Sequence, residues 1–343
     1  MPRRLVCTGP RQLEWQEYSE PELGPDSVRV RPLYGAAKHG TEMSIYTGYG
    51  LARGVYNDRT QIFEPLTEDY TGYPFRVGNM AVGIVEELGS EVTRLQRGDR
   101  VCVYSSFAET VTTRASDCWP MPDGMPWQTA VCLDPADFAL GAVRDSRARL
   151  GDAVAVFGMG AIGLVVLQML RQAGVGPIIA LEPLEGRRQI AMQLGAHYAL
   201  DPTSCDAGKE IRRLTDGRGA DVCIDYSGSR AALQQALRGV AYGGTVALGA
   251  YPPAYGAGLD LGAEAHHNVP NIVFTRACSE PNREHPRWDN DRIYATAWGM
   301  LARGEVSGEL IVQPVVTPAE LPEAYAEIAA HPERYLKLGV RYS

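Results

Sequence analysis

Residues 153–182 read AVAVFGMGAIGLVVLQMLRQAGVGPIIALE, in which two apolar runs flank a glycine-rich turn. Residues 153–157 have the length and composition of a buried strand, and residues 164–173 carry apolar side chains at helical spacing. Residues 177–181 have the composition of a second buried strand, which ends at Glu182. The order of strand, glycine turn, helix, strand and acid predicts a dinucleotide-binding βαβ unit.

Each glycine of this turn has its own physical reason. Gly158 permits the tight turn, Gly160 lets the backbone approach a pyrophosphate, and Gly163 lets the helix pack closely on the strand. The backbone N–H groups of the first helical turn then face the phosphates. We therefore expect Gly158, Gly160, Ala161, Ile162 and Gly163 to bind the cofactor. Three glycines in six residues and polar flanks argue against a membrane span here.

The acid at the end of the second strand bears on the choice between NAD and NADP. A carboxylate there accepts hydrogen bonds from the ribose hydroxyls and repels a 2′-phosphate. Arg187 and Arg188 follow five and six residues later and could hold a phosphate instead. Because an acid occupies the strand end, we predict NAD, with Glu182 and Arg187 in its site.

The composition limits the class of protein. A chain of 343 residues, 45% hydrophobic and 22% charged, predicts a soluble protein of two domains. A net charge of −8 without a basic stripe argues against nucleic-acid binding and favours small-molecule partners. The first residues lack the apolar segment of a secretory signal, so we expect a cytoplasmic protein without membrane attachment. Seven cysteines without a CxxC pair indicate scattered reduced thiols.

The pattern of predicted strands and helices changes near residue 150. Residues 151–280 alternate predicted strands and helices, with further strands at 195–200, 220–225, 244–248 and 271–276. This alternation predicts an α/β fold with a doubly wound parallel sheet. Residues 1–150 carry short β-like runs separated by Gly and Pro turns, as in a small antiparallel barrel. Residues 281–343, with predicted helices at 291–303 and 318–330, are expected to return to the first domain.

At this point the chain resembles the medium-chain dehydrogenase/reductase family, which includes the zinc alcohol and polyol dehydrogenases. The resemblance runs from Leu5 to the C-terminus and adds a set of short motifs to the glycine turn. These motifs are Gly40-Thr41-Glu42, Gly78-Asn79-Met80, Gly98-Asp99-Arg100-Val101, Asp134-Pro135 and Gly151-Asp152. The resemblance implies a GroES-like, β-rich substrate domain divided around a Rossmann NAD-binding domain. It also implies a reacting centre between the two.

The positions that hold catalytic zinc in the family differ in this chain. The matching residues are His39, Asn79, Met80 and Asp134. Asn and Met are poor zinc ligands, and zinc needs about four N, S or carboxylate donors. The four-cysteine structural lobe of the family is also missing, since only Cys102 and Cys118 occur in that region. We therefore predict no metal, with His39 and Asp134 as the alternative ligands if zinc binds.

Without zinc, another group must take the proton from the substrate hydroxyl. Lys38 and His39 occupy the vacated metal position; a lysine beside cationic NAD has a lowered pKa, and histidine titrates near neutral pH. Asp134 could orient either base, and Thr41 matches the proton-relay hydroxyl of the family. Taken alone, Lys38 also fits a surface lysine and His39 a core histidine. The choice between the two bases stays open.

Five further segments carry a narrower resemblance, namely Gly35–Glu42, Gly78–Gly83, Asp134–Phe138, Ser279–Asn282 and Pro286–Trp288. They resemble the bacterial glycoside 3-dehydrogenases of this superfamily. Such enzymes oxidise one ring hydroxyl of a sugar, at C3, to a ketone with NAD. A polyhydroxylated ring requires hydrogen-bonding groups and a stacking face. The residues expected to supply these are Glu42, Asn79, Asp137, Glu280, Asn282 and Trp288, although Asp137 and Asn282 also fit turn or capping roles.

Three hypotheses follow for the function. The first is an NAD-dependent dehydrogenase of a sugar or glycoside. The second is a zinc alcohol or polyol dehydrogenase with atypical ligands, and the third a non-catalytic nucleotide-binding relative. The apolar edge strand at residues 271–276 predicts a homodimer, or a tetramer built from dimers.

Overall fold

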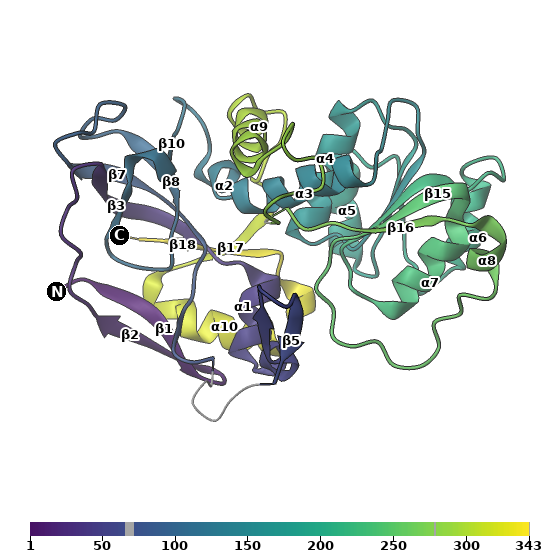
Figure 1. Cartoon of the computed structure of the whole chain (residues 1–343), viewed down its shortest axis with the longest axis horizontal. Helices are drawn as coiled ribbons and strands as arrows, with labels where there is room; N and C mark the ends of the chain where they lie inside the picture. Colours follow the sequence, from purple (N-terminus) through teal and green to yellow (C-terminus); the bar gives the residue numbers. More distant parts are fainter. Residues whose placement is uncertain (66–71, 278, 343) are drawn as a thin grey trace. The chain divides into compact units, whose positions relative to one another are not determined.

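The structure is a computed structural model that describes residues 1–65, 72–277 and 279–342 (Figure 1). The side chains of His39, Leu51 and Ala52 lie outside this description. The chain divides into two compact units. The first comprises Met1–Val131 and Val312–Ser343, and the second comprises Cys132–Ile311.

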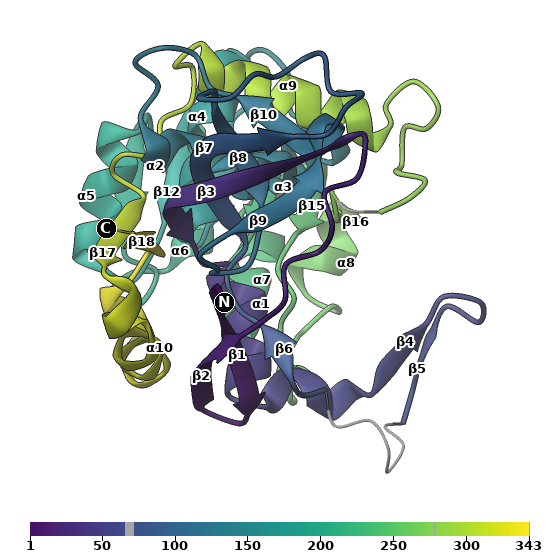
Figure 2. The same ribbon diagram turned by 90° about the vertical axis from the view of Figure 1, so that its left-hand side faces the viewer.

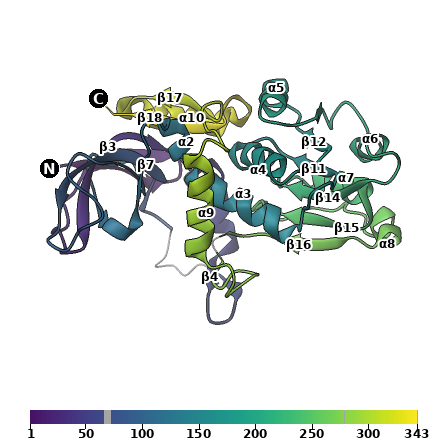
Figure 3. The same ribbon diagram turned by 90° about the horizontal axis from the view of Figure 1, so that it is seen from above.

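These boundaries differ from the expected ones at residues 150 and 281. Helix α3 (Leu133–Asp145) packs against α4 (Ala161–Gln172) and α9 (Asn290–Ala302), so all three helices belong to the second unit. Figure 3 shows α9 lying alongside α3. The chain therefore returns to the first unit at Val312, after α9.

The second unit is built on a six-stranded parallel sheet in the order β13-β12-β11-β14-β15-β16. The chain forms the central strand β11 first, then adds β12 and β13 on one side of it and β14, β15 and β16 on the other. This is the doubly wound arrangement predicted from the sequence. The strands are β11 (Val154–Phe157), β12 (Ile178–Leu181), β13 (Tyr198–Leu200), β14 (Ala220–Asp225), β15 (Val240–Leu248) and β16 (Asn271–Phe274). β11 and β12 are buried throughout, as their apolar composition predicts.

Helices cover both faces of this sheet. The crossovers α4 and α5 (Glu185–Gln193) connect β11 to β12 and β12 to β13. Helices α6 (Ala207–Arg213) and α7 (Arg230–Gly239) pack against the other face, where Phe157 and Ile179 meet Ile211 and Leu237 in one buried cluster. The short helix α8 (Glu264–Asn268) precedes the edge strand β16. Successive crossovers thus bury the sheet on both sides.

The first unit is rich in strands, and most of them pair antiparallel (Figure 2). Its larger sheet has the order β10-β8-β7-β3-β18-β17, and β9 also pairs with β3. These strands are β3 (Ser27–Ala36), β7 (Met80–Leu88), β8 (Arg100–Tyr104), β9 (Val111–Arg114), β10 (Cys118–Pro120), β17 (Val312–Val316) and β18 (Lys337–Arg341). The tail of the chain therefore completes this sheet, with β18 between β3 and β17.

Two smaller sheets complete the first unit, so its strands do not form the single small barrel expected. β1 (Arg3–Gly9) pairs with β2 (Gln12–Glu17) and β6 (Phe75–Arg76). β4 (Val55–Asn57) and β5 (Ile62–Glu64) form a hairpin that extends from the rest of the unit (Figure 2). The unit also contains α1 (His39–Tyr46), α2 (Trp127–Ala130) and α10 (Leu321–Ala330). Within the described ranges, no helix combines the length and apolar composition needed to cross a membrane.

Candidate active site

The glycine turn joins β11 to α4 in the second unit. Gly158 has a φ of +89°, which only glycine adopts without strain, and a Cβ there would lie 2.7 Å from the backbone nitrogen of Ser227. A Cβ on Gly163 would lie 2.0 Å from the carbonyl oxygen of Gly158. A Cβ on Gly160 would have no heavy atom within 4 Å. The turn is therefore tightly packed at Gly158 and Gly163 and open at Gly160, the glycine expected to face a pyrophosphate.

Helix α4 begins directly after this open glycine. Gly160 is its N-cap, and no side chain caps the helix. The first backbone N–H groups of an α-helix have no partner within the helix, and they carry its positive dipole end. The N–H groups that begin at Ala161 and Ile162 therefore fit an anionic ligand.

Glu182 is buried beside the turn, with 4% of its surface exposed. Its Oε2 accepts a hydrogen bond from the backbone N–H of Met159 at 2.7 Å, and its Oε1 accepts one from Leu184 at 3.2 Å. The carboxylate therefore lies against the glycine turn, as the βαβ pattern predicts for the acid at the strand end. A negative charge there opposes a second phosphate on the ribose.

The two arginines of α5 differ in their surroundings. Arg188 donates from Nη1 to the carbonyl oxygens of Glu182 and Pro183, at 2.8 and 2.5 Å, and lies 3.8 Å from Asp201. These contacts hold Arg188 against the main chain that follows β12. Arg187 is half-buried on the same helix. The contacts of Arg188 with the main chain are structural ones.

The candidate bases lie where β3 leads into α1 in the first unit. Lys38 is the N-cap of α1 and is half-buried. His39 is the first residue of the helix, but its side chain lies outside the described residues. Thr41 is exposed, and its carbonyl oxygen accepts a hydrogen bond from Ser44 Oγ at 2.7 Å. The start of α1 thus carries all three predicted proton-transfer residues.

Glu42, a predicted substrate-binding residue, is instead bonded within the core of the first unit. Oε1 accepts from the backbone N–H of Lys38 at 2.9 Å, and Oε2 accepts from the hydroxyl of Tyr325. Burial raises the pKa of Glu42, although the hydrogen bonds from Tyr325, Lys38 and Gly78 act against that rise. Because both oxygens have partners in the chain, Glu42 fixes the start of α1.

Lys337 holds the residue before Lys38. Its side chain is 3% exposed, and Nζ donates to the carbonyl oxygen of Ala37 at 2.7 Å. The sequence analysis did not identify Lys337 or Tyr325, because their contacts join residues 300 and 283 positions apart. The only local signal is a lysine directly before the apolar residues 338–340 of β18. These two residues and Glu42 hold the backbone around Lys38.

Asn79 and Met80 occupy the start of β7. Met80 is 1% exposed, and Asn79 is half-buried. The backbone of Asn79 donates to Ala36 and accepts from Ser105, both at 3.0 Å. Its amide Nδ2 is buried and makes no hydrogen bond with the part of the chain that the structure describes. Asn79 therefore retains a donor that a bound ligand could satisfy.

Asp134 and Asp137 lie in the N-terminal half of α3, in the second unit. They are 4% and 2% exposed. Tyr226, which is bonded to the carbonyl oxygen of Phe138 at 2.9 Å, has a pKa raised by burial and by the negative charge of Asp137. The two aspartates are therefore buried carboxyl groups on one helix.

Glu280 and Trp288, predicted to contact substrate, are engaged within the second unit. Glu280 is exposed and accepts a hydrogen bond from Asn290 Nδ2 at 2.5 Å. The guanidinium carbons of Arg144 and Arg292 lie 3.5 and 4.2 Å from the ring centroid of Trp288. Two cations thus cover the ring that was expected to stack on a sugar. A sugar would have to displace one of them.

A second acidic site beside the glycine turn was not predicted. Asp225 ends β14 and is 1% exposed, and its Oδ1 accepts from the backbone and the hydroxyl of Ser227 at 2.7 and 2.6 Å. Burial raises the pKa of Asp225. Because Ser227 packs on Gly158, Asp225 fixes the opposite wall of the turn. The sequence Asp225-Tyr-Ser-Gly228 after a buried strand is the signal that could have identified it.

The comparisons with known proteins agree with this geometry. A family model described as "Alcohol dehydrogenase GroES-like domain" matches residues 25–128, and one described as "Zinc-binding dehydrogenase" matches residues 161–276. D-guloside 3-dehydrogenase of Escherichia coli K12 is 42% identical over 349 aligned positions, which cover 99% of this chain and 100% of that protein. This chain belongs to the medium-chain dehydrogenase/reductase family. It is an oxidoreductase of the class that acts on CH–OH groups.

Solved structures of this family share the fold. A zinc-binding dehydrogenase of Sinorhizobium meliloti 1021, bound to NADP, has a TM-score of 0.79 at 20% identity, covering 99% of each chain. An alcohol dehydrogenase of Escherichia coli CFT073, complexed with NADH, has a TM-score of 0.76 at 18% identity, again covering 99% of each. The fold alone is therefore compatible with either nucleotide.

Two of the four residues at the zinc positions of this family, Asn79 and Met80, are poor zinc donors. No three His, Cys, Asp or Glu side chains form a metal-binding group among those described, which do not include the His39 side chain. Cys102 and Cys118 are buried thiols that donate to carbonyl oxygens, and burial raises the pKa of Cys118 to about 12. Zinc binds thiolate, imidazole and carboxylate, whereas Asn79 offers an amide and Met80 a thioether.

Proposed function

We propose that this protein is an NAD-dependent dehydrogenase that oxidises a secondary ring hydroxyl of a glycoside, at C3, to a ketone. The observation that carries the proposal is the full-length identity of 42% with D-guloside 3-dehydrogenase. The aligned region covers 99% of this chain and therefore includes both units. The chemistry follows from what the chain supplies at the glycine turn and at the start of α1.

The glycine turn fits NAD. Gly160 leaves room for a pyrophosphate, the uncapped start of α4 supplies N–H donors, and Glu182 places a carboxylate beside the turn. When bound there, NAD supplies the acceptor for the hydride that leaves the substrate carbon. The same negative charge that suits two ribose hydroxyls disfavours a 2′-phosphate.

Oxidation of the hydroxyl releases one hydride and one proton. The C3–H bond breaks with its electron pair, and the O3–H proton passes to a base as the carbonyl forms. We assign that base to Lys38 or His39, with the Thr41 hydroxyl as a relay and Asp134 as the orienting acid. The contacts of Lys337 and Glu42 support the assignment, because together they fix the peptide bond between Ala37 and Lys38.

The proposal includes no zinc. The donor chemistry of Asn79 and Met80 supports this, since neither side chain is a good zinc ligand. Elemental analysis of active enzyme is the test. One zinc per chain, removed by a chelator together with activity, would contradict this part and favour a zinc polyol dehydrogenase with His39 and Asp134 as ligands.

Steady-state kinetics tests the reaction. The enzyme should reduce NAD with methyl glycosides, and NMR of the product should place the ketone at C3. Simple aliphatic alcohols should be poorer substrates. If an aliphatic alcohol is better than every glycoside tested, the sugar assignment is wrong, and if no alcohol reduces NAD, the protein is a non-catalytic relative.

Substitution of the two candidate bases tests the mechanism. Positioned general-base catalysis contributes about 10² to 10⁴ in rate. Lys38→Met or His39→Ala, whichever removes the base, should lower kcat by that factor while NAD affinity changes little. Lys209→Met, which removes an exposed lysine from the second unit, is the control and should retain kcat. Near-normal kcat in both variants would exclude both residues as the base.

A further inference from the structure

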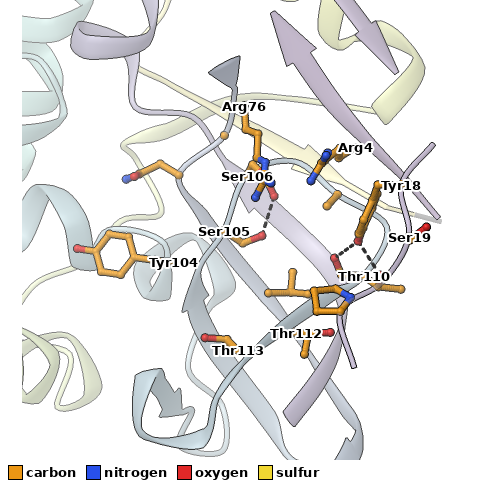
Figure 4. Close-up of a pocket in the computed structure, with 15 residues that line it drawn as sticks. Arg4, Tyr18, Ser19, Arg76, Tyr104, Ser105, Ser106, Thr110, Thr112 and Thr113 are labelled. Atoms are coloured by element: carbon orange, nitrogen blue, oxygen red, sulfur yellow. Dashed lines mark hydrogen bonds between the residues drawn. The ribbon is translucent and has the colours of Figure 1, made fainter. Parts of the chain in front are cut away.

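A cavity of about 720 Å³ lies within the first unit, lined by residues of β1, β6, β8 and β9 and of the loops beside them (Figure 4). Its volume falls in the range of roughly 300–1,000 Å³ that is typical of small-molecule sites. Asn79 lines it, together with Tyr104 and Ser105 at the end of β8. The cavity therefore includes one of the predicted substrate-binding residues.

Two arginines give this cavity a positive charge. Arg4 on β1 and Arg76 on β6 both line it, and their side chains project toward the same part of the cavity in Figure 4. Neither forms an ion pair with any residue that the structure describes. Four acids are adjacent in sequence to lining residues. Glu109 and Glu20 pair with Arg3 at 2.7 Å and Arg29 at 3.4 Å, and Glu17 and Glu22 are exposed and do not line the cavity. No described Asp or Glu lines the cavity.

Hydrogen-bond donors in the same wall are unused. Arg4 Nε and Asn79 Nδ2 are buried and make no hydrogen bond with the described chain. A buried donor without a partner costs about 1–3 kcal/mol, so a ligand that satisfies it is stabilised. Tyr18 is held in place by hydrogen bonds from its hydroxyl to Thr110 at 2.7 Å, and its ring lies 4.9 Å from the Arg4 guanidinium. The Arg4 guanidinium therefore lies against a ring that is itself held in place.

We infer that this cavity binds an anionic group, a carboxylate or a phosphate, carried by the glycoside substrate. The inference rests on the proposed function, because Asn79 connects the cavity to the candidate site. Guanidinium groups bind carboxylate and phosphate oxygens through paired N–H donors, and the hydroxyls of Ser106 and Thr113 add polar surface beside them. The preferred substrate is then a glycosiduronate or a glycoside phosphate and not a neutral glycoside.

Isothermal titration calorimetry tests this directly. The probes are a methyl hexopyranoside, the corresponding methyl hexopyranosiduronate and the corresponding methyl hexopyranoside 6-phosphate. Each is titrated in the absence of NAD, so that no reaction occurs. At least one anionic compound should bind wild-type protein about tenfold or more tightly than the neutral glycoside, and added salt should reduce the difference. Comparison of the two anionic probes shows whether the cavity prefers a carboxylate or a phosphate.

Charge-removing variants locate the site. Arg76→Gln should lower the affinity for the anionic compound about tenfold or more, and Arg4→Gln should lower it by a similar factor. Arg97→Gln removes an exposed arginine of the same unit that does not line the cavity, and it should bind like wild type. Arg76 is exposed, so its substitution tests the inference even if Arg4→Gln fails to fold.

The outcomes separate this inference from the proposed function. The inference would be wrong if the wild-type protein bound neutral and anionic glycosides with equal affinity. It would also be wrong if Arg76→Gln and Arg97→Gln had the same affinity for the anionic glycoside. Either result would stand even if glycosides are oxidised. Tight binding of the anion that depends on Arg76, without NAD reduction by any glycoside, would support the anion site and contradict the proposed function.

Discussion

At the scale of single residues, we expect Glu182 to govern the choice between NAD and NADP. Its carboxylate is held by the N–H groups of Met159 and Leu184, so its charge has a fixed position. Hydrogen bonds to a charged group contribute about 1.5–3 kcal/mol, or roughly 10- to 150-fold in affinity. Glu182→Gln should therefore lower kcat/KM for NAD by at least about tenfold and reduce the preference over NADP.

Kinetics with both nucleotides measures this effect. Glu185→Gln, which removes an exposed carboxylate from the start of α5, is the matched control. Comparable efficiency of the wild-type enzyme with NAD and NADP would contradict the prediction and direct attention to Arg187.

Glu42 introduces a pH dependence of stability. Burial raises its pKa above the ordinary value of 4.5, so the folded state favours the protonated form. The stabilisation from this group is complete below the unfolded-state pKa and is lost as pH rises through the folded-state pKa. Glu42→Gln should therefore flatten the fall in thermal unfolding midpoint from pH 4.5 upward.

Scanning calorimetry across this pH range measures the difference between the variant and wild type. Glu323→Gln, an exposed carboxylate on α10, should change the profile little. Parallel profiles for wild type and Glu42→Gln would show that Glu42 does not titrate differently in the folded state.

At the scale of elements, two glycines of the turn have different roles, one in the packing of the fold and one in nucleotide binding. A methyl group on Gly163 would collide with the carbonyl oxygen of Gly158, whereas one on Gly160 would meet no protein atom. Gly163→Ala should destabilise the fold by about 1–3 kcal/mol, as overpacking does. Gly160→Ala should fold normally but bind NAD more weakly, because its methyl group occupies the pyrophosphate face.

Denaturant unfolding and fluorescence titration with NADH measure the two effects independently. Gly186→Ala on α5, where an added methyl group meets no protein atom, serves as the control for both. If Gly160→Ala retains full affinity for NADH, the pyrophosphate does not pass over this glycine.

The parallel sheet was predictable because each of its strands is a short apolar run between turn residues. Helix α3 was not predicted; its proline, Pro135, lies in the first turn, where a helix tolerates it. Strands β1 and β2 alternate weakly and depend on pairing with each other. Because α3 packs on α4 and α9, the second unit begins at Cys132 and not at the predicted residue 151. No local sequence pattern indicates this packing.

The candidate site was predictable only where its chemistry is local. Glu182 follows a strand directly, so its place beside the turn could be predicted from the sequence. Glu42 and Trp288 were expected to contact substrate, but tertiary partners engage them. Those partners, Tyr325 for Glu42 and Arg144 for Trp288, are distant in sequence. The cavity with Arg4 and Arg76 likewise forms only when β1 pairs with β6.

At the scale of the whole molecule, the edge strand β16 predicts assembly. It pairs only with β15 and exposes Ile272 and Phe274, the latter with 72% of its surface accessible. An exposed apolar edge strand favours pairing with a second copy across a two-fold axis. We expect a homodimer or a tetramer of dimers, and Phe274→Asp should shift the protein toward monomer.

Light scattering at micromolar concentration measures the molecular mass of both forms. Tyr198→Asp changes an exposed aromatic residue on β13, at the opposite edge of the same sheet, and should leave assembly unchanged. A monomeric wild-type protein would exclude this mode of association.

The place of β18 in its sheet also governs the order in which the chain can fold during synthesis. The second unit is contiguous from Cys132 to Ile311, so all of its strands are available before residue 312 has been made. The first unit lacks β18, and with it Lys337 and one of the partner strands of β3, until residues 337–341 have been made. Domains generally fold as units while they are made. The fold of the second unit should therefore form on the ribosome first, and the main chain around Lys38 becomes fixed only after β18 has been made.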